Sequence, residues 1–333
     1  MSDRAPSAEG SLRVAFLGNA RWSVTPLECV VASRHPVVLV ATREPRPSGR
    51  GGTLTPTKVA EAARRLALPL REVRTVRDEA GLAALREARP DVLAVVAYGE
   101  ILTAEILTVP RLMPVNVHFS LLPKLRGAAP VQRAVMQGLR ETGVTTMHMD
   151  ERLDTGAILL QESTEVRDEE DAGALAGRLA RRGGALLVET LDRLAERTLT
   201  ETPQNDAAAT YAAKITREDE IVDWSRSPDE IARQVRGLFP KPGASTTFRG
   251  KRLKILRVSA GDVGVVTAPR AAPGSMFVFS KQFVPEGRLV VVTGGGGEDF
   301  QLGLDVVQPE GKKPMWAKEF VNGYRPEQGE RLG

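Results

Sequence analysis

The chain has 333 residues, more than a single hydrophobic core usually contains, so its length predicts two domains. With 42% apolar and 26% charged residues it has the composition of a soluble globular protein, and no apolar run is long enough to span a membrane. The net charge of +4 belongs to the second half, because residues 207–333 hold 19 basic and 15 acidic side chains whereas residues 1–206 hold 27 of each. A basic second half is compatible with binding to a polyanion, although charge alone favours ordinary solvated surface.

The amino-terminal stretch and the cysteine content indicate the compartment. Residues 1–11, MSDRAPSAEGS, lack the apolar centre of a signal peptide, and we expect a disordered tail there. Cys29 is the single cysteine, which excludes an internal disulfide. We therefore expect a cytoplasmic protein.

The chain then begins as an α/β fold. Residues 12–17 form an apolar run typical of a buried parallel strand, a helix is predicted from Pro26 to Ala32, and residues 36–41 supply a second buried strand. The turn that starts at Gly18 lacks the second and third glycines of a dinucleotide-binding fingerprint. We therefore expect no nicotinamide or flavin cofactor.

Residues 42–58, TREPRPSGRGGTLTPTK, predict a mobile loop and not a helix or strand. They contain three prolines, three glycines, four basic residues and one acid. A loop of this length inside a compact domain is usually functional, and its charge and glycines suit the binding of phosphates. The alternative is a surface linker that merely tolerates arginine.

The next elements continue the α/β pattern. Helical spacing predicts helices over residues 59–66 and 79–88, and residues 92–97 form a third buried strand. Tyr98 and Gly99 close that strand in a tight turn.

Residues 114–132, PVNVHFSLLPKLRGAAPVQ, form the stretch around which the chain is organised. Two valines alternate with Asn116 and His118, so a short strand buries the valines and directs both polar side chains to its other face. A stiff apolar turn and the start of a helix follow. This arrangement is typical of a site at the carboxyl end of an open α/β sheet.

The rest of the first half completes the predicted sheet. Residues 143–149 and 157–162 are predicted strands on either side of a turn that contains Asp154. A long helical segment follows over residues 170–197, interrupted by two glycines at 183–184.

The character of the chain changes after this helix. The polar, proline-containing stretch 199–206 predicts a linker. Beyond it we expect one helix over residues 229–236 and then a small β-barrel, because short strand-like runs alternate with Gly/Pro turns. The runs are residues 245–248, 252–258, 274–279, 289–293 and 303–307.

Several motifs in this order resemble the folate-dependent formyltransferases. The central ones are NVHFSLLP, RGAAPVQ and, about thirty residues on, ERLDTGAILL. Further blocks, three of them in the second half, are RPSGRGGTLTP from Arg46, VVAYGEIL from Val95, AAKITREDEIVDWS from Ala212, VRGLFPKPGA from Val235 and VQPEGKKPMWAKEFVNGY from Val307.

The resemblance implies a fold, a division into domains and an activity. It implies a Rossmann-like α/β catalytic domain with a mostly parallel sheet over residues 12–197, a linker over 198–216, and an OB-like β-barrel over 217–333 that contacts tRNA. It further implies that 10-formyltetrahydrofolate donates its formyl group to the α-amino group of methionine on initiator tRNA, for translation initiation.

Formyl transfer to an amine requires stabilisation of negative charge on the formyl oxygen and transfer of a proton from the amine to the departing nitrogen. Asn116 supplies N–H donors for the first task, and His118 is suited to pass protons at neutral pH. Asp154 would orient His118 or hold a water that carries the proton. Taken singly, Asn116 could cap a turn, His118 could be a core histidine, and Asp154 could be an ordinary turn former.

Other roles follow from the resemblance alone. It implies folate contacts from Ser120, Leu121, Leu122, Pro123, Tyr98 and Gly99, and tRNA contacts from Arg46, Arg50 and Lys58, with Arg50 as the strongest candidate. The first turn departs from the family, which usually has Gly-Thr-Pro-x-Phe, because Arg21 and Trp22 stand there.

The sequence leaves several alternatives open. A sugar-nucleotide formyltransferase has a similar catalytic domain and barrel, whereas a glycinamide ribonucleotide formyltransferase would lack the extra barrel. A folate-binding hydrolase and a non-catalytic folate- or RNA-binding protein are further possibilities. We expect no metal, because the three histidines have no metal-ligand spacing, and we expect a monomer with no membrane partner.

Overall fold

The computed structural model describes residues 10–48, 52–260, 271–279, 288–294 and 301–333. Most of the predicted tail, Arg50 and the Gly-rich stretch from residue 295 lie outside the described residues. The chain divides into two compact units. The first comprises Met1–Pro130, Glu141–Glu165 and Ala176–Ala213, and the second comprises Val131–Arg140, Val166–Leu175 and Lys214–Gly333.

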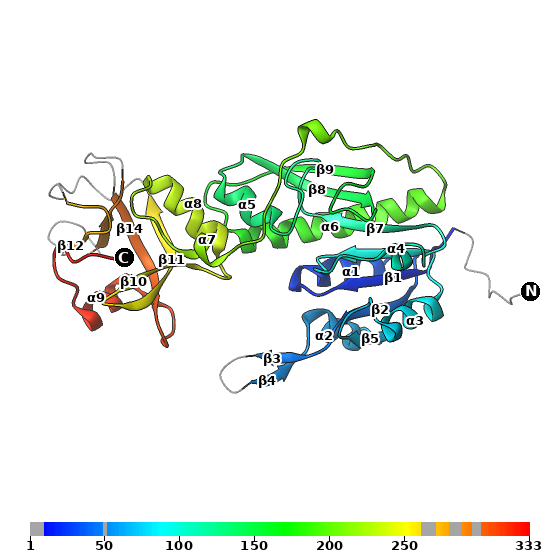
Figure 1. Cartoon of the computed structure of the whole chain (residues 1–333), viewed down its shortest axis with the longest axis horizontal. Coiled ribbons are helices and arrows are strands. Elements are labelled where there is room, and N and C mark those ends of the chain that lie inside the picture. The colour runs from blue at the N-terminus through cyan, green and yellow to red at the C-terminus, as the bar shows by residue number, and fades with distance from the viewer. Residues whose placement is uncertain (1–9, 49–51, 261–270, 280–287, 295–300) are drawn as a thin grey trace, which may run out of the picture. The chain divides into compact units, whose positions relative to one another are not determined.

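The first unit is built on a seven-stranded sheet (Figure 1). Its strands, in spatial order, are β5 (Leu70–Val73), β2 (Val37–Arg43), β1 (Val14–Gly18), β6 (Val92–Val96), β7 (Met113–His118), β8 (Glu141–His148) and β9 (Ile158–Glu165). The first five run parallel, and β8 and β9 are antiparallel to their neighbours. The predicted mostly parallel α/β fold is therefore confirmed.

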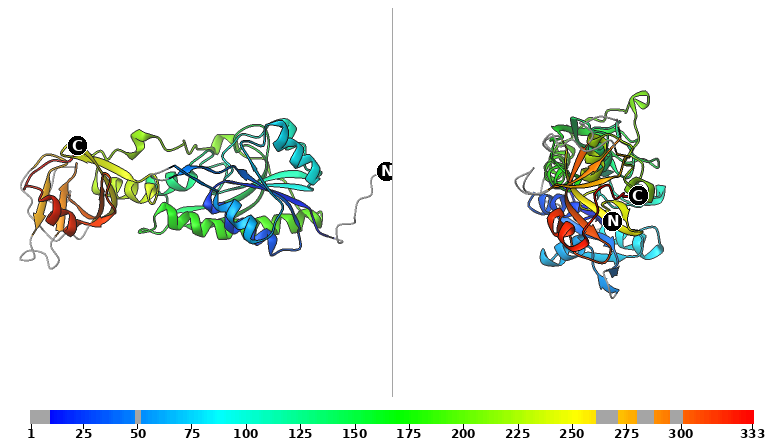
Figure 2. Two further views of the ribbon diagram at one scale, coloured as in Figure 1. Left: turned by 90° about the horizontal axis from the view of Figure 1, so that it is seen from below. Right: turned by 90° about the vertical axis from the view of Figure 1, so that its left-hand side faces the viewer.

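Helices cover both faces of this sheet (Figure 2). On one face α3 (Glu79–Ala88) and α4 (Ala104–Leu107) pack against alternate side chains of β1, β2 and β6. On the other lie α1 (Val24–Val31), α2 (Lys58–Arg65) and the long α6 (Ala172–Ala195). Because both faces are covered, the central strands β1 and β6 are buried along their whole length, which explains their continuous apolar sequences.

The predicted loop over residues 42–58 contains regular structure, so that prediction was wrong in part. Residues Arg46–Ser48 form β3 and Thr53–Thr55 form β4, an antiparallel pair that projects from the end of β2 (Figure 1). Threonines favour extended backbone and support pairing even where every side chain of β4 is exposed. Thr57 then caps α2 by accepting a hydrogen bond from Ala60 N at 3.0 Å.

The predicted interruption of the long helix was also wrong, because α6 continues through its two glycines. A Cβ on Gly183 would lie 2.8 Å from Val117 Cγ1, and one on Gly184 would lie 2.6 Å from Cys29 Sγ. These glycines therefore permit close packing of α6 on β7 and α1, at the usual cost of glycine in a helix.

The stretch predicted as a linker, residues 198–216, lies against the first unit up to Ala213. Thr202 forms a bridge pair with Ile158, and Tyr211 pairs with Arg126. The short 3-10 helix η2 (Asp206–Ala208) lies in the chain between these two contacts. Another short 3-10 helix, η1 (Arg21–Ser23), directly precedes α1.

The second unit is an antiparallel sheet with helices beside it (Figure 1). Its core includes Trp224, Phe248 and Phe320, and Phe320 stacks on Tyr324 at 4.8 Å between ring centroids. Among the described residues β10 and β12 lie at the two ends of the sheet, so closure into a barrel stays a prediction. Its elements are α5 (Pro130–Met136), α7 (Arg217–Glu220), α8 (Pro228–Leu238), β10 (Ala244–Phe248), β11 (Lys251–Ala260), β14 (Gln301–Pro309), β13 (Arg288–Val292), β12 (Met276–Phe279), β15 (Met315–Trp316) and α9 (Ala317–Tyr324).

None of the helices in the described ranges is both long and apolar enough to cross a lipid bilayer.

Candidate active site

The strand order of the first unit reverses between β1 and β6, so the loops after these strands diverge and leave room for a ligand. Asn19, directly after β1, ties the loops together. Its Oδ1 accepts hydrogen bonds from Arg43 N at 2.7 Å and from Thr42 Oγ1 at 3.0 Å, and its Nδ2 donates to the carbonyl of Tyr98. Sequence reasoning assigned no role to Asn19, although a polar side chain at a strand end was a usable signal.

Strand β7 places Asn116 and His118 as predicted. Val115 and Val117 are buried on one face, and the two polar side chains lie on the other. The Asn116 side chain is half-buried and makes no hydrogen bond with any residue in the described ranges. His118 is only 6% exposed, so its ring is held inside the protein and not in bulk solvent.

The structure brings His118 and Asp154 together. His118 Nε2 donates a hydrogen bond to the Leu125 carbonyl at 2.9 Å, and this partner fixes the ring orientation. His118 Nδ1 then lies 3.7 Å from Asp154 Oδ1, which is too long for a direct hydrogen bond but close enough for the carboxylate to attract the ring when it is protonated.

Asp154 is held by backbone and side-chain partners that the sequence did not reveal. Its φ is +54°, a left-handed conformation that aspartate tolerates better than most residues. Its Oδ2 accepts the backbone N–H of Gly127 at 2.7 Å, and its own carbonyl accepts Gln204 Nε2 at 2.9 Å. These contacts leave Oδ1 directed toward His118.

The predicted folate wall is a tightly bonded turn. Ser120 is fully buried, and its hydroxyl donates to Lys124 O at 2.6 Å. The backbone N–H of Leu122 donates to Thr145 Oγ1 at 3.1 Å, and the Leu122 side chain is buried. Leu121 and Pro123 are partly exposed, so in this turn they are the apolar side chains a ligand could reach.

Tyr98 and Gly99 occupy the loop after β6 in different ways. The Tyr98 side chain is buried in the apolar cluster under α3 and α4, and this burial raises the pKa of its phenol. Its backbone faces the Asn19 side. Gly99 has φ +81° and no atom within 4 Å of a would-be Cβ, so the backbone here is open to a ligand.

The predicted tRNA residues lie on the projecting hairpin and the helix after it. Arg46 is exposed on β3, and Lys58 at the start of α2 forms an ion pair with Glu61 at 2.7 Å. Neither is bonded to the residues around His118 within the described part of the chain.

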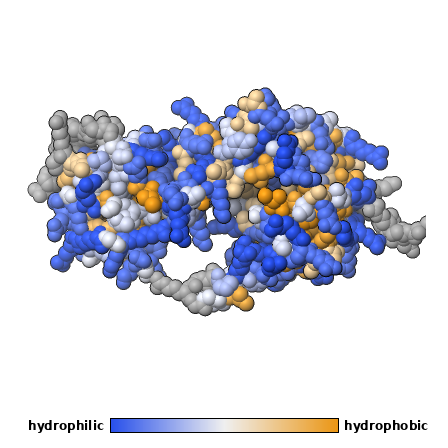
Figure 3. All heavy atoms as spheres, in the orientation of Figure 1, coloured by the Kyte–Doolittle hydropathy of each residue, from blue (hydrophilic) through white to orange (hydrophobic). Residues whose placement is uncertain are grey.

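Apolar surface accompanies the site loops. The visible face is mostly hydrophilic, and hydrophobic side chains gather over the first unit (Figure 3). Ile101, in the loop after β6, is 66% exposed, and Leu153, next to Asp154, is 57% exposed. Exposed large apolar side chains beside a polar cluster are typical of ligand-binding surface.

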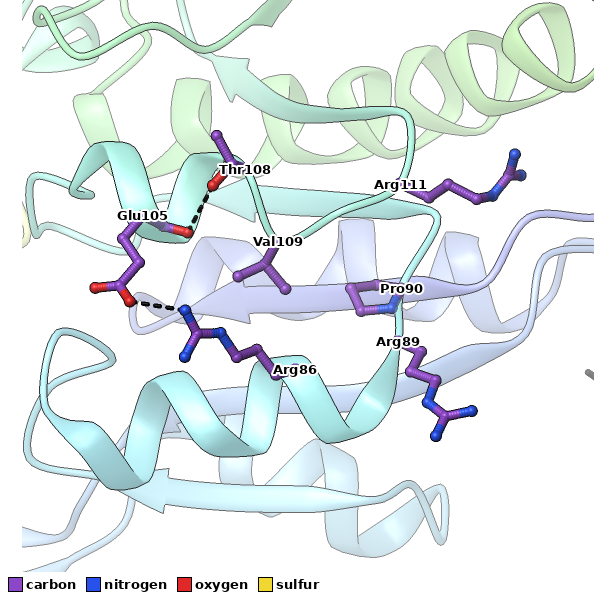
Figure 4. A pocket seen from close by; sticks show the side chains of 7 residues that line it. All are labelled: Arg86, Arg89, Pro90, Glu105, Thr108, Val109 and Arg111. Carbon is purple, nitrogen blue, oxygen red and sulfur yellow. Dashed lines mark hydrogen bonds and ion pairs between the residues drawn. The ribbon is translucent and has the colours of Figure 1, made fainter. Parts of the chain in front are cut away.

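A cavity of about 350 Å³ lies elsewhere in this unit, between the end of α3 and α4 (Figure 4). It contains none of the predicted site residues. The side chains of Arg89 and Arg111 extend away from Val109 and Pro90 at its centre, so the arginines do not converge on one anion (Figure 4). In the described ranges, no three His, Cys, Asp or Glu side chains are grouped as a metal site would require.

Comparison with known sequences gives matches along nearly the whole chain. The family described as formyl transferase matches residues 12–191, and the family described as formyl transferase, C-terminal domain, matches residues 214–325. A methionyl-tRNA formyltransferase from Roseiflexus castenholzii is 43% identical over 324 residues, covering 97% of this chain and 99% of that protein. Another, from Geobacter metallireducens, is 38% identical over 322 residues, with 97% and 99% coverage.

Solved structures share the fold at much lower identity. HypX from Aquifex aeolicus, in complex with tetrahydrofolic acid, superimposes with a TM-score of 0.63 at 15% identity. The match covers 94% of this chain and 47% of HypX. At this identity the likeness supports the architecture alone.

Proposed function

The chain belongs to the formyl transferase family, and from that premise we propose which of its residues carry out the transfer. The reaction is the formylation of methionine on initiator methionyl-tRNA, a step of translation initiation. The donor is a formyl-carrying folate, which we identify as 10-formyltetrahydrofolate. The observation that carries the assignment of residues is the grouping of Asn116, His118 and Asp154 at the carboxyl edge of the sheet.

Asn116 stabilises the charge that develops on the formyl oxygen. When the α-amino nitrogen of methionine attacks the formyl carbon, the carbonyl oxygen becomes negative until the bond to the folate nitrogen breaks. The Asn116 carboxamide has no hydrogen bond to a described residue, so its two N–H donors are available for that oxygen.

His118 moves the proton. Because Nε2–H is donated to Leu125, Nδ1 of the neutral ring carries the lone pair that accepts a proton from the attacking amine. The same Nδ1–H then donates to the departing folate nitrogen, so the proton count closes and the ring returns to its neutral form.

Asp154 stabilises the intermediate imidazolium. With 3.7 Å between Oδ1 and Nδ1, the carboxylate acts through its charge and leaves Nδ1 accessible to the substrate nitrogen. Orientation of the ring is the task of the Leu125 carbonyl, so Asp154 is not needed for it.

The experiment that tests this function compares acceptors in parallel. The purified chain is incubated with 10-formyltetrahydrofolate and, in separate samples, with methionyl initiator tRNA, an amino-sugar nucleotide, glycinamide ribonucleotide or buffer. We expect loss of the donor and formation of formylmethionyl-tRNA in the first sample. Equal loss of the donor in buffer would indicate a hydrolase, and loss in the amino-sugar sample alone would indicate a sugar-nucleotide enzyme.

A further inference from the structure

A three-residue segment, Leu125 to Gly127, holds both members of the His118–Asp154 pair. The Leu125 carbonyl accepts His118 Nε2–H at 2.9 Å, and the Gly127 N–H donates to Asp154 Oδ2 at 2.7 Å. Leu125 also has φ +59°, which is unfavourable for leucine and persists only where the surroundings impose it. The 3.7 Å separation of the pair therefore depends on what fixes this segment.

The residue in the middle of the segment, Arg126, provides an anchor. Its side chain is only 2% exposed. Its Nε and Nη2 donate to Gln204 Oε1 at 3.0 and 2.8 Å, and Nη2 also pairs with Asp206 Oδ1 at 2.7 Å. The guanidinium group thus binds a stretch of chain about eighty residues away.

Gln204 connects Arg126 to Asp154 through hydrogen bonds. Its Oε1 is occupied by Arg126, which turns its amide nitrogen toward the turn that carries Asp154. Gln204 Nε2 donates to Asp154 O at 2.9 Å and to Gly156 O at 2.7 Å. Arg126 is therefore linked to Asp154 by two routes, through Gln204 on one side and through Gly127 on the other.

Packing alone does not explain an arginine at this place. Burying a guanidinium group is unfavourable unless its donors are bonded, and an apolar side chain of similar volume would fill the space without that cost. The carboxylate of Asp206 is 70% exposed, so solvent weakens the ion pair. What the guanidinium supplies that an apolar residue cannot is a fixed pair of donors for Gln204.

We propose that Arg126 is a positioning residue for formyl transfer, which acts through Gln204 and Gly127 to hold Asp154 beside His118. The inference rests on the proposed function, since it assigns the role within that reaction. It predicts a defect in the chemical step and not in substrate binding, because the Arg126 side chain is buried and is bonded to Gln204 and Asp206.

The first test separates kcat from KM. Arg126→Met keeps much of the side-chain volume but removes the donors. We expect kcat to fall about 10- to 100-fold, with KM for charged tRNA and for the folate within about twofold of wild type, because sub-ångström misplacement of reacting groups has effects of this size. Arg111→Met is the control, since Arg111 also pairs with a carboxylate, Asp91 at 2.6 Å, but it precedes the start of β7, at the opposite end of that strand from His118. Its kcat should equal that of wild type.

The second test is a double-mutant cycle with Asp154→Ala. If Arg126 acts through Asp154, then Arg126→Met should lower kcat by less than about twofold in the Asp154→Ala background. Additive losses would overturn the proposal, because they would show an effect that does not pass through Asp154. A change confined to KM would overturn it as well. Should Arg126→Met fail to fold, Gln204→Leu replaces it in the same cycle with the same expected outcomes.

Failure of the positioning role is distinguishable from failure of the function. If wild-type protein does not formylate methionyl-tRNA, the proposed function fails and the inference fails with it. If wild type is active and His118→Ala is not, the function stands, and the cycle alone decides the role of Arg126.

Discussion

Gly127 is the position where the smallest change to the protein should most disturb the site. Its φ is +118°, a conformation that side chains with a Cβ rarely adopt. A Cβ built there would lie 2.8 Å from Ala212 O, a backbone atom that cannot rotate away. The Gly127→Ala variant therefore has to move backbone, and the N–H that it moves is the one that donates to Asp154.

The magnitude follows from these contacts. To reach the 3.4 Å of ordinary contact, the Cβ and Ala212 O must separate by about 0.6 Å, the difference between 3.4 and 2.8 Å. The strained φ costs about 1–3 kcal/mol, and weakening the hydrogen bond to the carboxylate costs about 1–2 kcal/mol more. Together these costs should lower the free energy of unfolding by about 2–5 kcal/mol, and we expect kcat to fall by about 10- to 100-fold.

The assay measures thermal unfolding together with kcat and KM for charged tRNA. Gly250→Ala is the matched control, because Gly250 also has a positive φ, +72°, but no atom lies within 4 Å of its would-be Cβ. That variant should lose about 1 kcal/mol of stability and keep the wild-type kcat. If Gly127→Ala also kept the wild-type kcat, the hydrogen bond from Gly127 would have no part in placing Asp154, and our account of the site would be wrong.

Three further predictions concern separate parts of the molecule. Asn116→Ala or His118→Ala should lower kcat by orders of magnitude with an unchanged circular dichroism spectrum, and near-normal turnover in either would remove the catalytic assignment. Arg46→Ala, at an exposed side chain on β3, should raise KM for charged tRNA and reduce the salt slope by about 1; an unchanged titration would place the hairpin outside the tRNA contact. Burial lowers the pKa of His35, whose Nδ1 also accepts the N–H of Leu12 at 3.0 Å. Below a pH of about 6.5, His35 binds a proton more readily in the unfolded chain than in the folded protein. The free energy of unfolding should therefore fall on acidification, and it should fall less in His35→Gln. Equal slopes of this free energy against pH in the two proteins would refute the prediction.

The sequence was most informative where burial dictates residue type along a whole element. The apolar runs predicted for residues 12–17 and 92–97 correspond to β1 and β6, because a strand covered on both faces admits few polar side chains. Strand β5, LREV, was missed because it lies at the edge of the sheet and carries two charged residues. The hairpin β3–β4 was missed because every side chain of β4 is exposed. Its sequence therefore lacks the alternation of apolar and polar residues that predicts a strand.

Within the site, the sequence predicted the placement of side chains but not the backbone contacts. Alternation along β7 predicted that Asn116 and His118 share a face, and the structure agrees. The groups that orient the pair, the Leu125 carbonyl and the Gly127 N–H, belong to the main chain, which every residue possesses. These backbone groups therefore cannot be predicted from residue type. Gln204 does act through its side chain, but in a polar stretch its amide could not be distinguished from solvated surface.

These contacts also bear on where the first unit ends. A boundary at residue 197, where the helical pattern ends, would leave out Gln204, whose amide holds the Asp154 turn. It would also leave out Ala212, whose N–H donates to Arg126 O at 2.7 Å and whose carbonyl borders Gly127. The chain therefore has to return across the carboxyl edge of the sheet after α6 before Asp154 can face His118. The placement of Asp154 beside His118 is therefore a property of the first unit up to Ala213, because residues 204–212 hold the turns that carry this pair.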